Sequence, residues 1–321
     1  MVKSILRVVR YKNLIIVFAT LYLMRFCIVQ PLLLRKGMDL QLSELFFLFL
    51  VLSTVFITAA GYVINDYFDT RTDLVNHPQT VIVGRSISRR IAIILHWGLS
   101  ILGVLLGIVV SFGIHKPFFS VVFLVIPGML WFYSTTYKRQ FLIGNLIVAV
   151  FTAIVPLMVI LFEIPKLYEV YWQPLILSPG IFNSIIYWVG GYSIFAFLLT
   201  LFREIVKDIE DFEGDAEFGR NTLPVVLGIK NTRLVASSIL LLTILLLTYL
   251  FGAYLNFLPS GKFDYFSLIY LVCALIIPIF LLLVKLLSAD NKVDYHTVSR
   301  WSKFVMLAGI LYSVLFRFLL V

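Results

Sequence analysis

Nine apolar runs in the sequence are each about as long as a helix that crosses a lipid bilayer. A membrane-spanning α-helix needs roughly 20 apolar residues, because the hydrocarbon layer is about 30 Å thick and each residue adds about 1.5 Å. The runs are Leu14–Leu34, Leu45–Asn65, Ile91–Gly113, Pro117–Tyr137, Phe141–Phe162, Ile181–Phe202, Leu234–Phe257, Tyr265–Val284 and Phe304–Val321. They predict an all-α membrane protein, since a helix bonds its own backbone N–H and C=O groups within lipid.

The composition agrees with a chain embedded in lipid. It is 61% hydrophobic and 13% charged, whereas soluble domains carry about 25% charged residues. The segments between the runs are too short for a soluble domain, so we expect one integral-membrane domain over 1–321. Both cysteines, Cys27 and Cys273, lie inside apolar runs, which excludes a disulfide framework and a zinc spacing.

Lysine and arginine residues predict the orientation of the chain. Nineteen of the 26 fall before the first run or in every second loop after it, and five fall in the other loops. Because positive residues stay on the cytoplasmic side, the N-terminus is predicted to be cytoplasmic. The net charge of +9 is dispersed over many loops. It therefore reflects topology and attraction to anionic lipid, and nucleic-acid binding is not expected.

Two acidic clusters with the same spacing follow the second and sixth runs. Both read D-x-x-D-x-x-x-D, and both fall on the predicted cytoplasmic side. Their members are Asp66, Asp69 and Asp73 in the first cluster, and Asp208, Asp211 and Asp215 in the second. Offsets of 0, 3 and 7 lie within about 60° on an α-helix, so each cluster is expected to point one way.

Like charges at membrane depth need compensation, since each costs about 2.5–3.5 kcal/mol there. Mg²⁺ prefers oxygen ligands and commonly bridges carboxylates to substrate phosphates. The two clusters therefore predict a site that holds a metal-bound diphosphate. The alternative is that these acids only end their helices and meet the cytoplasm.

Other polar residues near the predicted cytoplasmic face are candidates for substrate binding. The basic candidates for the diphosphate are Arg71, Lys138, Arg139, Arg203 and Lys207. Asn65 precedes Asp69 by four residues and is a candidate neutral metal ligand, whereas Asn13 is either a helix cap or a substrate contact. Tyr133 is an aromatic candidate for facing a carbocation. For each cation the alternative is ordinary flanking of a membrane helix.

The two halves of the chain share an organisation. Each has an apolar run, an acidic cluster and then a basic, glycine-containing connection, which suggests quasi-repeat halves of roughly 1–140 and 141–321 with a site between them. Prolines inside the runs predict kinks at Pro31, Pro127, Pro156 and Pro278. A secondary transporter is the alternative from another class, although transporter sites usually lie near the bilayer midplane.

The motifs resemble those of the UbiA superfamily of intramembrane prenyltransferases. The resemblance rests on "NDYFDTRTD" and "KDIEDFEGD", supported by "RYKN", "YKRQFLIGN" and "GRNTLPVVLG" in the same order. It implies nine transmembrane helices around a central cavity, with a cytoplasmic cap over two Mg²⁺ ions and an isoprenyl diphosphate. The metal ligands it implies are Asn65, Asp66, Asp69, Asp73, Asp208, Asp211 and Asp215.

The same resemblance assigns further roles by motif position. Asp66, Asp69, Asp211 and Asp215 would be catalytic, and Lys138 and Lys207 would contact the diphosphate. The chain departs from the family at "QTVIVGR", Gln79–Arg85, where many relatives have an arginine. Arg85 is the candidate replacement.

The acceptor is the finer question. "REIVKDIEDFEGD" is most similar to the branch that transfers geranylgeranyl to a glycerol-phosphate lipid. An aromatic acceptor, as in quinone or haem O synthesis, is the alternative, and a non-catalytic assembly protein is a further one. The resemblance places the protein in a bacterial or archaeal cell membrane with its active site facing the cytoplasm, and leaves its oligomeric state open.

Overall fold

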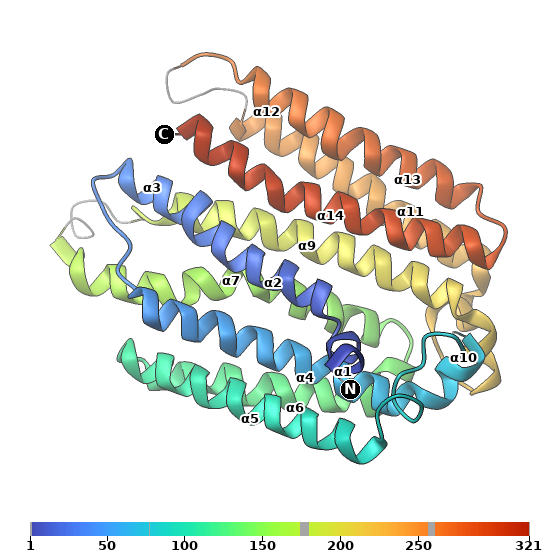
Figure 1. Cartoon of the computed structure of the whole chain (residues 1–321). Helices are drawn as coiled ribbons and strands as arrows, with labels where there is room; N and C mark the ends of the chain where they lie inside the picture. Colours follow the sequence, from blue (N-terminus) through green and yellow to red (C-terminus); the bar gives the residue numbers. More distant parts are fainter. Residues whose placement is uncertain (1, 77, 174–179, 256–260, 321) are drawn as a thin grey trace. The chain divides into compact units, whose positions relative to one another are not determined.

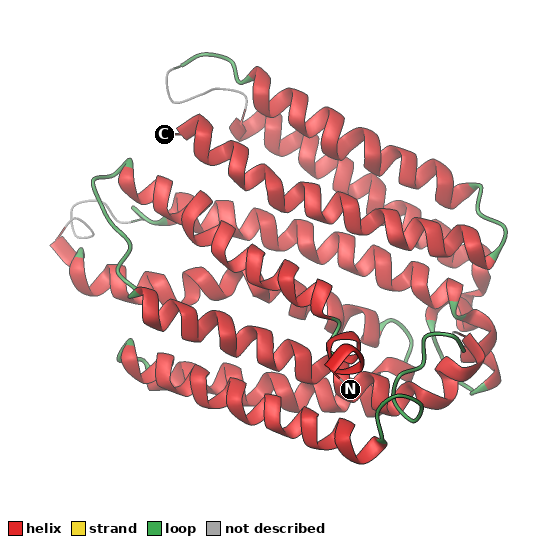
Figure 2. Cartoon of the chain, viewed as in Figure 1, coloured by secondary structure: helices red, strands yellow, loops and turns green. Residues whose placement is uncertain are grey.

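A computed structural model describes residues 2–76, 78–173, 180–255 and 261–320. Figure 2 draws helices and loops and no strand in this described part, which confirms the predicted all-α class. One isolated backbone bridge pairs Val83 with Ile87.

The helices follow one another along the chain with short connections (Figure 1). The α-helices are α1 (Val2–Val8), α2 (Tyr11–Leu23), α3 (Gln30–Leu34), α4 (Glu44–Asn76), α5 (Arg89–Gly113), α6 (Ser120–Thr135), α7 (Ile143–Val170), α9 (Asn183–Glu210), α10 (Phe212–Glu217), α11 (Leu223–Leu250), α12 (Tyr265–Tyr270), α13 (Ile277–Leu287) and α14 (Lys292–Leu320). Short π-helical turns are η1 (Met24–Val29), η4 (Phe251–Leu255) and η5 (Leu271–Ile276), and short 3₁₀ turns are η2 (Pro117–Phe119) and η3 (Tyr137–Arg139).

Within the described residues, nine helical runs are long and apolar enough to cross a membrane, which confirms the predicted number. They are Tyr11–Leu34, Glu44–Asn76, Arg89–Gly113, Pro117–Thr135, Ile143–Val170, Asn183–Glu210, Leu223–Leu255, Tyr265–Leu287 and Lys292–Leu320. Several extend beyond their apolar runs, because hydropathy marks the part in lipid and not the end of the helix. The predicted ends at Phe257 and Val321 lie outside the described residues.

Two of the four prolines follow a widened helical turn. Pro31 and Pro278 are each the second residue of the α-helix that follows η1 or η5. Proline has no N–H to donate to the carbonyl four residues earlier, and a π-helical turn changes that bonding pattern locally. Pro127 instead lies inside α6, and Pro156 lies within α7. Kinks at the four prolines stay predictions.

The chain forms two compact units. The first comprises 1–21, 40–140 and 158–182. In it α4, α5 and α6 pack together, and close helix contacts depend on small residues. Gly103 of α5 lies against Ser53 and Ile57 of α4, and Gly113 lies against Phe46. A later residue of α5 thus meets an earlier residue of α4, which shows that the two helices are antiparallel. The start of α5 therefore lies beside the acidic end of α4.

An apolar cluster also holds the connection between α4 and α5 in this unit. Val83 and Ile87 of the connection are buried with Val8 of α1, Val63 of α4 and Ala92 of α5. Ser88 caps α5 by accepting from the N–H of Ile91. The connection therefore lies against α1 and the acidic half of α4.

The second unit comprises 22–39, 141–157 and 183–321. Its α9 packs against α11 and α14, and α13 packs against both α11 and α14. Gly228 (φ +78°) interrupts α11 near its start, so the helix is kinked there. The unit boundary at residue 140 coincides with the predicted boundary between halves, although each unit also takes short segments from elsewhere. The duplication itself stays a prediction.

Candidate active site

The first acidic cluster lies on one continuous helix, as predicted. Asn65, Asp66, Asp69 and Asp73 are all within α4, and the three aspartates share one face of it. The Asp69 side chain is 4% exposed and that of Asp66 is 16% exposed. Buried carboxylates of this kind require compensating positive charge or hydrogen bonds.

Arg10 provides that charge to Asp66. Its Nη2 atom lies 2.8 Å from Asp66 Oδ1, and its guanidinium carbon lies 5.0 Å from the ring centroid of Tyr62, one turn earlier on α4. Asn13 Nδ2 donates to the Tyr62 hydroxyl over 3.3 Å. Arg10 adopts φ +52° in the turn between α1 and α2, a left-handed conformation that costs a non-glycine residue about 1–3 kcal/mol.

Lys138 provides positive charge to the next turn of the same face. It lies in η3, directly after α6, and its ammonium donates to Asp69 Oδ2 and, over 3.2 Å, to Asn65 Oδ1. Three of the residues predicted for metal or diphosphate binding are thus brought together: Asn65, Asp69 and Lys138.

The second acidic cluster differs from the prediction of a single helical face. α9 ends at Glu210, Asp211 forms a break with φ −95° and ψ 7°, and Asp215 belongs to the short helix α10. The backbone N–H of Asp211 still bonds to the carbonyl of Lys207, so the break is a local irregularity. Repulsion between closely spaced acids and the glycine at 214 both disfavour a regular helix here.

The aspartates of the second cluster have polar partners within their unit. Asn145 Nδ2, at the start of α7, donates to Asp208 Oδ2 over 2.7 Å. Arg220 Nη1 lies 3.4 Å from Asp215 Oδ1, and both side chains are almost fully buried. Gly219, in the left-handed conformation (φ +62°), ends the helix and lets the chain return so that Arg220 meets Asp215.

Two predicted cations of α9 share one acid. Glu204 Oε1 accepts from Arg203 Nη1 over 2.8 Å and from Lys207 Nζ over 2.7 Å. All three side chains are partly buried. The arrangement places Arg203 and Lys207 within one turn of each other, directly before the second cluster.

Four other predicted residues differ in position and exposure. Arg71 is exposed and lies on the opposite side of α4 from the three aspartates, by the helical period. Arg139 is exposed, and Tyr133 is half-buried on α6. Arg85 is exposed and donates to the carbonyl of Pro78 within its own loop over 2.6 Å.

Four contributing residues were not singled out from the sequence: Arg10, Tyr62, Glu204 and Arg220. Helical spacing could have found two of them, because Tyr62 precedes Asp66 by four residues and Glu204 precedes Lys207 by three. Arg10 and Arg220 reach their aspartates through left-handed turns, which the residue types alone do not specify.

The side chains on this face of α4 fit a bound cation. Carboxylate and amide oxygens are ligands that Mg²⁺ prefers, and in the structure an ammonium group already occupies the position between Asn65 and Asp69. Within the described residues, no three His, Cys, Asp or Glu side chains lie close enough together to hold a metal. Substrate phosphates and water would therefore complete the coordination, as is usual for Mg²⁺.

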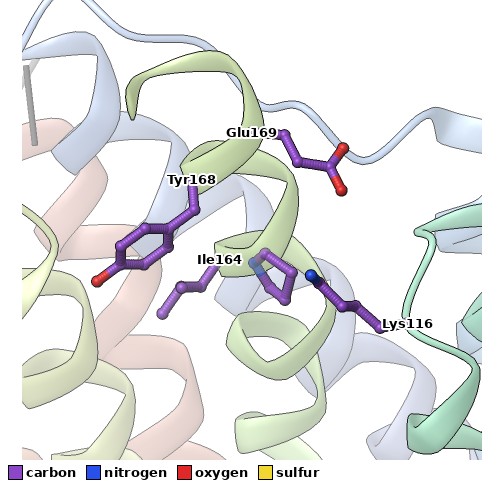
Figure 3. Close-up of a pocket in the computed structure, with 5 residues that line it drawn as sticks. Lys116, Ile164, Tyr168 and Glu169 are labelled. Atoms are coloured by element: carbon purple, nitrogen blue, oxygen red, sulfur yellow. The ribbon is translucent and has the colours of Figure 1, made fainter. Parts of the chain in front are cut away.

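A separate surface cavity lies in the first unit, away from the acidic end of α4. It has a volume of about 510 Å³ and is lined by Lys116, Ile164, Pro165, Tyr168 and Glu169. Figure 3 shows Lys116 across from the α7 residues Ile164 and Glu169. Lys116 follows the end of α5 opposite the acidic end of α4, so this cavity is not part of the acidic site.

The fold and these contacts define a helical membrane protein with paired acids and bases at the ends of two spans. Comparison with protein families matches residues 23–308 to the UbiA prenyltransferase family. The chain therefore belongs to the UbiA prenyltransferase family, and it is a membrane-embedded prenyltransferase.

Individual relatives agree with this assignment. The chain is 33% identical over 264 residues to a digeranylgeranylglyceryl phosphate synthase from Sulfolobus acidocaldarius, covering 81% of each chain. It is 34% identical over 236 residues to the synthase of that name from Sulfurisphaera tokodaii, covering 73% of this chain and 72% of the relative.

Solved structures show the same fold. A structure described as digeranylgeranylglyceryl phosphate synthase matches with a TM-score of 0.60 and 24% identity, covering 98% of both chains. A UbiA homolog from Archaeoglobus fulgidus bound to GPP and Mg²⁺ matches with a TM-score of 0.55 and 15% identity, covering 95% of this chain and 98% of that one. These likenesses support the fold alone.

Proposed function

We propose that this chain transfers a geranylgeranyl group from an isoprenyl diphosphate to a glycerol-phosphate lipid, with Mg²⁺, at the predicted cytoplasmic face of the membrane. The observation that carries the proposal is the charged face of α4, where Asp66 and Asp69 are each held by a base. The similarity to two archaeal synthases of digeranylgeranylglyceryl phosphate supports the choice of a glycerol-phosphate acceptor.

The metal part of the proposal is supported by the donor set. One Mg²⁺ ion would draw on Asn65 and on one or two carboxylates among Asp66, Asp69 and Asp73, and a second ion on one or two among Asp208, Asp211 and Asp215, with substrate oxygens and water as the remaining ligands. A homolog of the same fold binds GPP and Mg²⁺. When bound, the metal would offset the negative charge that develops as the diphosphate leaves.

The protein side chains would bind and orient the donor. Three cations would donate hydrogen bonds to diphosphate oxygens: Lys138, Lys207 and Arg203. Glu204 holds Arg203 and Lys207 close together before the isoprenyl diphosphate binds. Electrostatic stabilisation of this kind is usually the largest contribution to an enzymatic rate. The apolar spans around the site would exclude water, so that the allylic cation reacts with the acceptor hydroxyl instead.

The test is identification of the product by mass spectrometry. Purified protein in lipid nanodiscs would be incubated with Mg²⁺, labelled geranylgeranyl diphosphate and a panel of acceptors. We expect a product with geranylgeranylglyceryl phosphate that requires Mg²⁺. If only aromatic acceptors gave a product, the glycerol-phosphate acceptor would be wrong. Transport of a diphosphate without any prenyl transfer would contradict the proposal as a whole.

A further inference from the structure

Lys138 covers the acid that would bind metal. The Asp69 side chain is only 4% exposed, and the ammonium of Lys138 lies directly on its Oδ2 atom. The same ammonium lies 3.2 Å from Asn65 Oδ1. One positive group therefore bridges the two oxygens that α4 presents in successive turns.

This position conflicts with metal binding at the same oxygens. An ammonium and a divalent cation cannot both occupy the space between Asn65 Oδ1 and Asp69 Oδ2, because like charges repel at contact distance. Lys138 can leave, however. Its side chain is 28% exposed, it lies in the short turn η3 after α6, and lysine carries its charge on a flexible four-carbon stem.

We propose that Lys138 is a displaceable cation that occupies the metal position of the unloaded site and moves to the diphosphate when the metal binds. The inference rests on the proposed function and deepens it. Before loading, Asp69 is neutralised by Lys138 within the protein. After loading, Mg²⁺ neutralises Asp69 and the released ammonium neutralises part of the diphosphate, so the Asp69 carboxylate has a cationic partner in both states.

The exchange makes the binding of metal and the binding of diphosphate cooperative. Metal alone has to displace Lys138 without giving it a new partner, and diphosphate alone has to draw Lys138 away from a buried carboxylate. Each ligand lowers the cost of binding the other, and such coupling typically changes affinity by about 5–150-fold. A lysine that served only as a diphosphate ligand would leave the binding of metal alone unchanged.

The test measures Mn²⁺ binding without diphosphate, by electron paramagnetic resonance of the purified full-length protein. We expect Lys138→Met to lower the Kd for Mn²⁺ by about tenfold, within the usual range of coupling, and Lys138→Arg to stay near wild type. Lys12→Met is the matched control, because Lys12 is an exposed cation beside Asn13. A shift in Lys138→Met no larger than that of Lys12→Met would overturn the inference.

A double-mutant cycle locates the effect. If Lys138 acts through Asp69, the gain from Lys138→Met disappears when Asp69→Asn is also present. An equal gain in both backgrounds would mean that Lys138 acts through the general field of the site, and the exchange would be rejected.

A measurement on the wild-type chain does not depend on any variant folding. Mass spectrometry would follow the reaction of each lysine with an amine-specific reagent. We expect Mg²⁺ alone to increase labelling of Lys138 and to leave Lys12 unchanged, whereas no increase at Lys138 would contradict the exchange. Wild-type product formation, measured in parallel, separates failure of this inference from failure of the proposed function.

Discussion

At the scale of single residues, the site is organised by pairs of opposite charge within each unit. Asp66 is paired with Arg10, Asp69 with Lys138, and Asp215 with Arg220. The carboxylates could be predicted from their repeated spacing, and Lys138 from its place at the basic end of the fourth apolar run and from the family resemblance of "YKRQFLIGN". Arg10 could not be assigned, because its contact depends on a left-handed turn that propensities disfavour.

Arg10 offers a test of that pairing. Arg10→Gln removes the guanidinium from Asp66, and we expect prenyl transfer to fall about tenfold, which corresponds to about 1.4 kcal/mol of transition-state stabilisation. The melting temperature should change little, because the pair is partly exposed and contributes at most about 1 kcal/mol to stability.

Arg7→Gln is the control for Arg10→Gln. Arg7 is exposed on α1 and its substitution removes the same charge from the same end of the chain. Equal losses of transfer in both variants would attribute the effect to net charge and not to the contact with Asp66.

At the scale of helices, close packing in the first unit depends on glycine where two helices approach. The apolar runs predicted which segments are helical. They did not predict which helices pack together, because apolar side chains that face lipid and those that face another helix have similar hydropathy. The apolar runs alone do not mark the ends of α4 and α9, because both helices continue past them. For α4 the helical offsets of the first acidic cluster predicted that continuation. The break at Asp211 depends on local repulsion and on Gly214, which the helical period does not include.

Gly107 of α5 tests the packing of α5 against α6. A Cβ atom added there would lie 2.2 Å from Phe123 Cγ, and Phe123 is buried. We expect Gly107→Ala to destabilise the protein by about 1–3 kcal/mol through overpacking, seen as a lower melting temperature in detergent.

Gly98 on the same helix provides the comparison. A Cβ atom at Gly98 meets nothing within 4 Å, so Gly98→Ala should leave the melting temperature unchanged or raise it, by up to about 1 kcal/mol of helix propensity. A similar loss in both variants would argue against the close contact between Gly107 and Phe123.

At the scale of the whole molecule, the sequence predicted nine spans and the family, and the structure and the comparisons confirm both. These could be predicted because lipid imposes a length on each apolar run and because the acidic motifs are specific. The orientation in the membrane rests on the distribution of lysine and arginine alone and stays a prediction.

Labelling of single cysteines tests the orientation. In a variant without Cys27 and Cys273, a membrane-impermeant maleimide applied to intact cells should label Lys262→Cys and not Ser86→Cys. Both positions are exposed, and they lie in loops of opposite predicted sides. The reverse pattern would place the acidic ends of α4 and α9 outside the cell and contradict the proposed access of a cytoplasmic donor.

The most direct test of the account compares prenyl transfer by wild type, Asp69→Asn and Asp290→Asn in nanodiscs. Asparagine keeps the size of the side chain and removes its charge, and Asp290 is an exposed aspartate in the loop before α14. We predict that Asp69→Asn lowers kcat/KM by about 10³-fold, the scale of losing one main electrostatic contact, while Asp290→Asn keeps wild-type activity. Full activity in a folded Asp69→Asn protein would show that the acidic face of α4 does not bind the reacting diphosphate.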